Sequence, residues 1–188
     1  MAEQGSLVRL QDEYEIDLDW RGFELHPGIP PGGMLLDDMF GAERVRRMRP
    51  YLLDFARVQG VSGMVVPAHK PNTRRALALA EWARGKGRLH EVRTGLMDAY
   101  WREALDLEDD AVLARVAADA GLDGDAAVRG SREPEVRERV AEMGRAAAEA
   151  GVTGIPTFDV GGERVVGAQP YEVLAAAVER QGGRRRLH

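Results

Sequence analysis

The stretch GVTGIPTFDVGGERVVGAQPYEVL, residues 151–174, decides the fold class of this chain. After Pro156 it holds two short runs, Thr157–Val160 and Glu163–Val166, in which apolar and polar residues alternate with the period of a β-strand. The pair Gly161-Gly162 joins the runs, and two glycines suit the positive φ angles of a tight hairpin turn. The stretch therefore predicts a β-hairpin.

Helical periodicity flanks this hairpin on both sides. A final helix is predicted from about Pro170, with four apolar residues facing inward: Val173, Leu174, Ala177 and Val178. Between residues 41 and 151, apolar residues recur at spacings of three and four, as in a series of amphipathic helices. The first of these has Val45, Met48, Leu52 and Phe55 on one stripe, and Pro50 is expected to bend or split it.

The N-terminal residues predict a helix, a strand and a loop in that order. Residues 2–14 place Leu7, Leu10 and Tyr14 on one side of a short amphipathic helix. Residues 16–23 then alternate between apolar and polar side chains, which predicts a strand with one buried face near a sheet edge. The segment HPGIPPGG, residues 26–33, is too rich in proline and glycine to continue either element.

Composition excludes several classes of protein. A net charge of -5 argues against a nucleic-acid partner or an anionic membrane surface, and no apolar run is long enough for a membrane span or a signal peptide. We therefore expect a cytoplasmic protein. The chain has no cysteine, and its four histidines, His26, His69, His90 and His188, show no metal-ligand spacing. We expect neither a metal nor a cofactor.

Four motifs in this order resemble the DsbA-like thioredoxin domain family. They are WRGFELHPGIPPGG, HKPNTRRALALAEWAR, LMDAYWREALDLEDDAVLARVAADAGLD and GVTGIPTFDVGGERVVGAQPYEVL, and together they span most of residues 16–180. The likeness is strongest to a cytoplasmic branch that includes the FrnE-like oxidoreductases. This branch grades into the 2-hydroxychromene-2-carboxylate isomerases and the kappa-class glutathione transferases.

The resemblance implies a substrate-binding site at Thr153, Gly154, Ile155 and Pro156. In the family, Pro156 would follow a cis peptide bond, and the backbone of Ile155 would pair with a bound peptide or glutathione beside a Cys-x-x-Cys motif. His69 and Asn72 match a family loop that faces the sheet domain, and for Asn72 we expect helix N-capping before ligand contact.

The resemblance also implies that one part of the family's domain is missing from this sequence. The family begins with a central strand and a Cys-x-x-Cys at the start of its first helix, whereas GSLVRLQDEYEIDL, residues 5–18, matches the stretch just before the second strand. The missing strand and thiols would lie upstream of Met1 or would not exist. We favour an N-terminally shortened version of an active protein over a natural loss.

We accordingly expect an α/β fold, a thioredoxin-like sheet with a large helical insertion that lacks its first, central strand. Residues 1–27 and 151–181 would form the incomplete thioredoxin-like domain, residues 28–150 the insertion domain, and residues 182–188 a flexible basic tail.

Three functions remain open at this point. The first is a thiol-disulfide oxidoreductase, inactive in a chain without cysteine. The second is a glutathione-dependent isomerase or transferase of the same fold. The third is a redox-inert module that binds a peptide or forms a homodimer through exposed strand edges. The expected partner is a peptide or a small thiol such as glutathione.

Overall fold

The computed structural model describes residues 4–186, which form two compact units. One unit combines both ends of the chain, up to Arg21 and from Ala147 onward, and the other is continuous from Gly22 to Ala146. We call them the terminal unit and the central unit. In the described part of the chain, no helix has the length and apolar character needed to cross a membrane.

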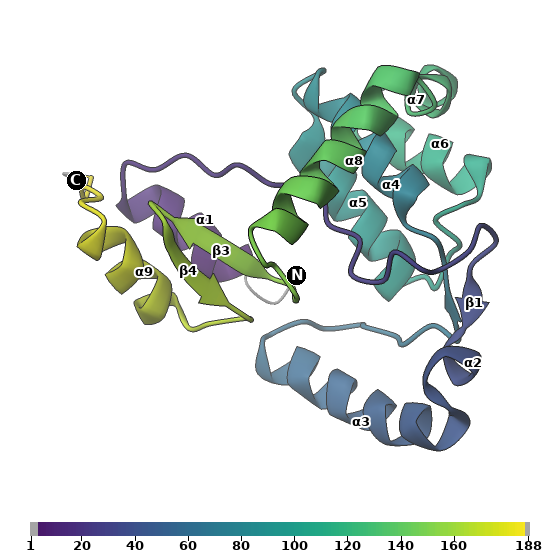
Figure 1. The fold of residues 1–188 in the computed structure, drawn as a ribbon, viewed down its shortest axis with the longest axis horizontal. Coiled ribbons are helices and arrows are strands. Elements are labelled where there is room, and N and C mark those ends of the chain that lie inside the picture. The colour runs from purple at the N-terminus through teal and green to yellow at the C-terminus, as the bar shows by residue number, and fades with distance from the viewer. Residues whose placement is uncertain (1–3, 187–188) are drawn as a thin grey trace. The chain divides into compact units, whose positions relative to one another are not determined.

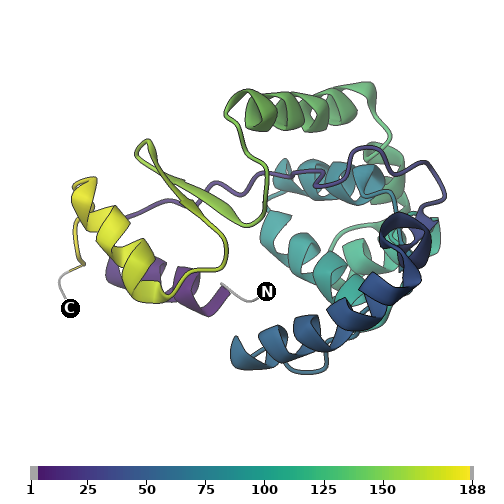
Figure 2. The same cartoon turned by 60° about the horizontal axis from the view of Figure 1, so that its bottom comes forward.

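The terminal unit consists of two helices and one β-hairpin. Helix α1 (Gln4–Glu13) lies beside helix α9 (Tyr171–Arg180), and strands β3 (Thr157–Val160) and β4 (Glu163–Val166) precede α9 (Figures 1 and 2). The predicted inner residues of α1, Leu7, Leu10 and Tyr14, are all buried. They pack with Val165, Leu174, Ala175, Ala177 and Val178 in one cluster. Val173, which we predicted to face inward, is exposed instead.

The hairpin has the predicted bounds and turn. β3 and β4 pair antiparallel with Thr157 opposite Val166 and Val160 opposite Glu163. Gly161 and Gly162 have φ angles of 58° and 92°, in the region that glycine adopts at no steric cost. The sequence prediction of a Gly-Gly hairpin is thus confirmed.

The predicted strand at residues 16–23 is wrong for the described chain. The side chains of Ile16, Leu18 and Trp20 do pack against the terminal cluster, and the residues between them are exposed. A strand also needs a neighbouring backbone to form its ladder. The described residues form two sheets of two strands each, and neither sheet includes this segment.

The basic residues 184–186 are held by hydrogen bonds, so up to Arg186 they are not the flexible tail that we predicted. The N–H of Glu15 donates to the C=O of Arg184 at 2.8 Å, and the N–H of Arg186 donates to the C=O of Glu13 at 2.8 Å. The Nε of Arg186 also donates to the C=O groups of Gln11 and Tyr14, each at 3.0 Å. The last carbonyl groups of a helix lack intrahelical partners, and Arg186 supplies partners at the end of α1.

The central unit is mainly helical. Its helices are α2 (Leu36–Phe40), α3 (Ala42–Val58), α4 (Arg74–Arg84), α5 (Leu89–Trp101), α6 (Asp110–Asp119), α7 (Gly124–Gly130) and most of α8 (Pro134–Glu149). Two short strands, β1 (Met34–Leu35) and β2 (His69–Lys70), pair antiparallel with Met34 opposite Lys70.

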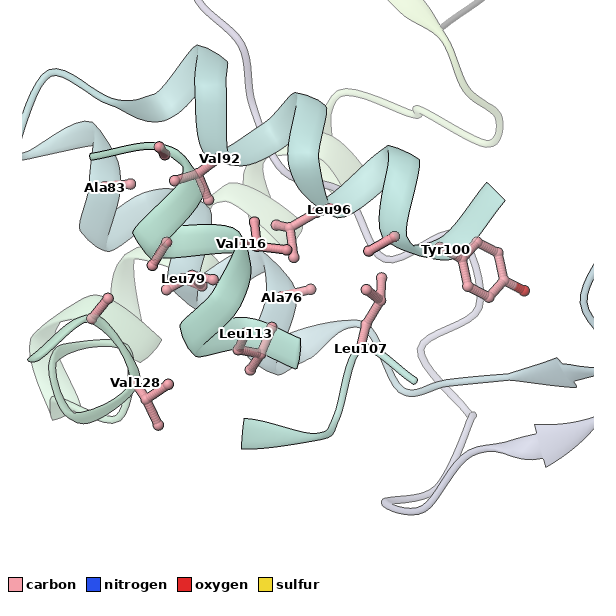
Figure 3. Packing of buried hydrophobic residues seen from close by; sticks show 14 residues of the cluster. Ala76, Leu79, Ala83, Val92, Leu96, Tyr100, Leu107, Leu113, Val116 and Val128 are labelled. Atoms are coloured by element: carbon pink, nitrogen blue, oxygen red, sulfur yellow. The ribbon is translucent and has the colours of Figure 1, made fainter. Parts of the chain in front are cut away.

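The core of the central unit lies between α4, α5, α6 and α7. Figure 3 shows its buried side chains, which include Leu79 of α4, Val92 of α5 and Leu113 of α6. Helix α3 contributes less than predicted: it buries Val45 and Ala56, whereas Phe55 is exposed. Pro50 lies inside α3, and the helix continues through it.

Candidate functional site

The predicted binding residues 153–156 lie in the loop that connects α8 to β3. Helix α8 ends because Gly151 adopts a φ of 69°, and the N–H groups of Gly151 and Val152 donate to the C=O groups of Ala148 and Ala147 at 2.8 and 2.9 Å. This is the usual way in which a glycine past a helix end satisfies the last carbonyl groups. The loop therefore leaves the helix at a fixed point.

The other end of the loop is fixed by the hairpin. The peptide bond between Ile155 and Pro156 is cis. The hydroxyl of Thr157 donates to the C=O of Gly154 at 2.7 Å, and the N–H of Gly167 donates to the C=O of Pro156 at 2.8 Å. These two hydrogen bonds hold both sides of Ile155 on the end of the β3–β4 hairpin.

Ile155 is the exposed apolar residue of this loop. Its side chain is 55% exposed, although isoleucine is among the residues most often buried. Within residues 4–186, its backbone N–H and C=O have no hydrogen-bond partner. Val166, at the end of β4 and opposite Thr157, is also exposed. An apolar side chain and a free donor and acceptor thus occur together.

The polar groups of residues 153–156 are mainly those of the backbone. None of residues 153–156 carries an ionisable side chain. At the start of the same loop, the guanidinium of Arg164 donates to the C=O of Ala150. At the first residue of β4, Arg180 donates to the carboxylate of Glu163, and this hydrogen bond lowers the pKa of Glu163. Thr153–Pro156 can offer backbone hydrogen bonds and apolar contact to a ligand.

Asn72 of the predicted loop has a structural role in the central unit. Its Oδ1 accepts from the N–H of Arg74 at 3.0 Å, although the N-cap position of α4 itself is Thr73. Its Nδ2 donates to the C=O of Ile29 at 2.6 Å, and the side chain is buried. Nearby, Nε2 of His69 lies 2.9 Å from the C=O of Gly32. Asn72 therefore accepts from the first N–H of α4 from the position before the N-cap and not from the predicted N-cap position itself, and its side chain is engaged by the protein.

Glu108 is a positioning residue that the sequence did not reveal. Its carboxylate accepts from the N–H of Asn72 at 2.7 Å and from the N–H of Gly32 at 3.0 Å. It therefore joins the loop at residues 26–33 to the start of α4. No local pattern signals this role, because the contact of Glu108 with Gly32 spans 76 residues of sequence. In the described residues, no three or more His, Asp or Glu side chains are grouped as for a metal ion.

Comparisons with known proteins agree on the family and the fold. The family model described as "DSBA-like thioredoxin domain" matches residues 2–179. Protein YwbO of Bacillus subtilis is 26% identical over 87% of this chain and 82% of its own length.

Solved structures are similar over most of the chain. A probable DsbA oxidoreductase from Streptomyces coelicolor has a TM-score of 0.74 and 25% identity, with 86% of this chain and 73% of that chain covered. A 2-hydroxychromene-2-carboxylate isomerase has a TM-score of 0.73 and 22% identity, with 95% and 87% covered. The predicted thioredoxin-like fold with a helical insertion is thereby confirmed.

Proposed function

This chain belongs to the DsbA-like thioredoxin domain family, and from that premise we propose that it binds an extended peptide or a small thiol compound through Thr153–Pro156. The proposed ligand pairs with the backbone of Ile155 as an added strand would. In the family's terms, the chain carries the substrate-recognition part of a thiol-disulfide oxidoreductase. A cytoplasmic location stays a prediction from the sequence.

The single observation that supports this proposal is that Ile155 combines an exposed apolar side chain with unpaired backbone groups in the described chain. Unpaired backbone groups beside an exposed apolar side chain are the features that strand-like peptide recognition uses. Leaving a donor or an acceptor without a partner costs about 1–3 kcal/mol if the group is also shielded from water, so a ligand that satisfies both groups gains affinity. Residues 153–156 lie next to a hairpin that fixes their position.

Thiol chemistry is not expected of residues 1–188. The thiolate is the nucleophile in disulfide exchange, and these residues contain no cysteine. We therefore expect the 188-residue chain to bind a thiol-containing peptide without reducing or oxidising it. An insulin-reduction assay with dithiothreitol should give the same rate with and without the chain.

Nuclear magnetic resonance with isotope-labelled protein tests the binding site directly. A titration with an unfolded peptide whose cysteine is alkylated should shift the amide signals of Gly154 and Ile155 and the methyl signals of Ile155. Glutathione in a parallel titration tests the isomerase-like alternative, because that activity requires glutathione to bind at the same residues. Signals that move only elsewhere in the chain, with either ligand, would refute the proposed site.

A pair of substitutions separates the site from general effects of charge. Ile155→Asp places a carboxylate beside the proposed ligand backbone and should weaken binding about tenfold, or about 1.4 kcal/mol. Val8→Asp is the matched control, because Val8 is similarly exposed at 50% and lies on α1 of the same unit. Equal affinity of the two variants would contradict the role of Ile155.

Self-association is the second function that an observation favours. β3 and β4 form a sheet of two strands, so each has an edge without a strand partner in the described chain. Such edges are templates for pairing with another copy. Multi-angle light scattering tests this: a molar mass of 20.7 kDa at all concentrations would exclude the homodimer.

A further inference from the structure

The hydrogen bonds of the β3–β4 hairpin (Figure 1) determine which way each backbone group of β3 points. In an antiparallel pair, opposite residues alternate between pairs that exchange N–H···O=C bonds and pairs that do not. Pro156 and Gly167 are of the first kind, because the N–H of Gly167 donates to the C=O of Pro156 at 2.8 Å. Two residues further along each strand, the register places Phe158 opposite Val165. Phe158 therefore turns its N–H and C=O toward β4.

Thr157 and Asp159 turn their backbone groups away from β4 for the same reason. They lie at the alternate positions, opposite Val166 and Arg164. Within residues 4–186, no other backbone bonds to the N–H or C=O of either residue, and no third strand lies beside β3. Since Ile155 also has an unpaired N–H and C=O there, donors and acceptors recur at every second residue along one edge.

The side chains of β3 differ between its two faces. Successive side chains of a strand point to opposite faces, and those of Phe158 and Val160 pack against the apolar cluster of the terminal unit. Both are only half-buried. On the other face Asp159 lies opposite Arg164, and both are exposed. A strand added to this edge would need apolar side chains on one face and polar side chains on the other.

A second segment borders the same apolar cluster. Ile16, Leu18 and Trp20 pack against it and are half-buried, like Phe158 and Val160. The cluster thus keeps partly exposed apolar side chains both in β3 and in this segment. An apolar side chain placed next to them would remove more of their surface from water, which favours association.

We propose that the free edge of β3 binds an extended segment of another polypeptide in which apolar and polar residues alternate. An extended strand is the form whose N–H and C=O groups repeat at the spacing of Thr157 and Asp159. Its apolar side chains pack beside Phe158, and its polar side chains lie on the exposed face with Asp159. The proposal rests on the proposed function in one respect, namely that the segment continues along β3 from its pairing with Ile155.

This pairing narrows the class of ligand. A ligand that lies opposite all of Ile155–Asp159 needs five residues in extended form. Glutathione is a tripeptide and is too short to pair with both ends of this edge. The geometry of β3 therefore favours a peptide substrate over a small thiol compound.

Amide hydrogen exchange measured by nuclear magnetic resonance tests the pairing in the whole chain. In the free chain, the amides of Thr157 and Asp159 should exchange faster than those of Phe158 and Val160. The acetylated and amidated heptapeptide Lys-Val-Thr-Val-Thr-Val-Lys, at saturation, should slow exchange at Ile155, Thr157 and Asp159 by about tenfold or more. A heptapeptide of the same composition with its valines adjacent is the control and should protect them less. Glutathione should protect Ile155 at most.

The pattern of protection separates this inference from the function proposed above. Protection of Ile155 without Thr157 and Asp159 would overturn the inference and leave the proposed function standing. Protection of none of the three would refute both. Slow exchange of Thr157 and Asp159 in the free chain that becomes slower with protein concentration would assign the edge to a second copy, and so would overturn the peptide as its occupant.

Two proline substitutions distinguish the two edges of the hairpin. Asp159→Pro removes an N–H that points away from β4, and Arg164→Pro, directly opposite, removes one that points away from β3. Asp159→Pro should weaken binding of the alternating heptapeptide about tenfold, and Arg164→Pro should change it by less than about twofold. Circular dichroism checks that both variants fold, and the exchange test on the unsubstituted chain decides if either does not. Equal affinities of two folded variants would overturn the assignment to β3.

Discussion

The hydroxyl of Tyr14 donates to Oε1 of Glu179 at 2.5 Å, across 165 residues of sequence. This bond joins the end of α1 to the last turn of α9, and Arg185 donates to the same carboxylate at 3.1 Å. The hydrogen bond from Tyr14 lowers the pKa of Glu179, and it raises the pKa of Tyr14 itself. A polar network therefore joins α1 to α9 in addition to their shared apolar cluster.

Tyr14→Phe should lower the free energy of unfolding by about 1 kcal/mol, because it removes one hydrogen bond and keeps the buried ring. Urea denaturation measures the change. Tyr51→Phe is the control, since Tyr51 is 69% exposed and should tolerate the loss of its hydroxyl. Equal stabilities of wild type and Tyr14→Phe would show that the hydroxyl does not stabilise the unit.

Alkaline pH should destabilise the fold through the tyrosines whose pKa the fold raises, Tyr14, Tyr100 and Tyr171. Burial raises the pKa of Tyr100 to about 12, and burial together with the hydrogen bond to Glu13 raises that of Tyr171 to about 12. The unfolded value is about 10, so the stability that these groups contribute is complete below pH 10 and is lost as the pH rises toward 12. Tyrosinate absorbance measures this titration. Titration of all four tyrosines near pH 10 in the folded chain would contradict the prediction.

Arg186→Ala should loosen the end of α1. It removes the donations from Nε to the C=O groups of Gln11 and Tyr14, and we expect a loss of about 1 kcal/mol. Amide hydrogen exchange should accelerate in residues 10–16 and not in the core of the central unit. Arg46→Ala, an exposed arginine of α3, serves as the control. Unchanged exchange at α1 would mean that the C-terminal residues do not secure it.

Two glycine substitutions should change the stability of the fold in opposite directions. A Cβ on Gly130 would lie 1.9 Å from Nε1 of Trp82, so Gly130→Ala should cost about 2 kcal/mol or more. A Cβ on Gly144 of α8 would meet no atom within 4 Å, so Gly144→Ala should stabilise by up to about 1 kcal/mol. Thermal unfolding measures both. A neutral Gly130→Ala would indicate that the Trp82 ring can move away.

The elements that the sequence predicted correctly are those with local causes. The hairpin follows from Gly161-Gly162 and the alternation around it, and the buried side of α1 follows from the spacing of Leu7, Leu10 and Tyr14. Each pattern lies within a short stretch of sequence, so it can be recognised without knowledge of the rest of the chain. The family resemblance supplied the overall fold.

The predictions failed where the structure of a segment depends on another segment that packs or pairs with it. Residues 16–23 have the alternation of a strand, but a ladder needs a second backbone. Phe55 continues an apolar stripe on α3, but the structure packs that helix on the side of Val45 and Ala56. Periodicity also could not reveal the contact of Glu108 with Gly32 and Asn72, because it joins residues far apart in sequence.

The division of the chain into two units implies an order of events on the ribosome. The central unit is continuous, so all of its residues have been synthesised once translation passes Ala146. α1 is made before the central unit, whereas α9 and Arg184–Arg186, against which it packs, are made after it. Leu7, Leu10 and Tyr14 therefore lack the side chains of α9 that cover them until synthesis has passed the whole central unit, and chaperones can bind them in this period.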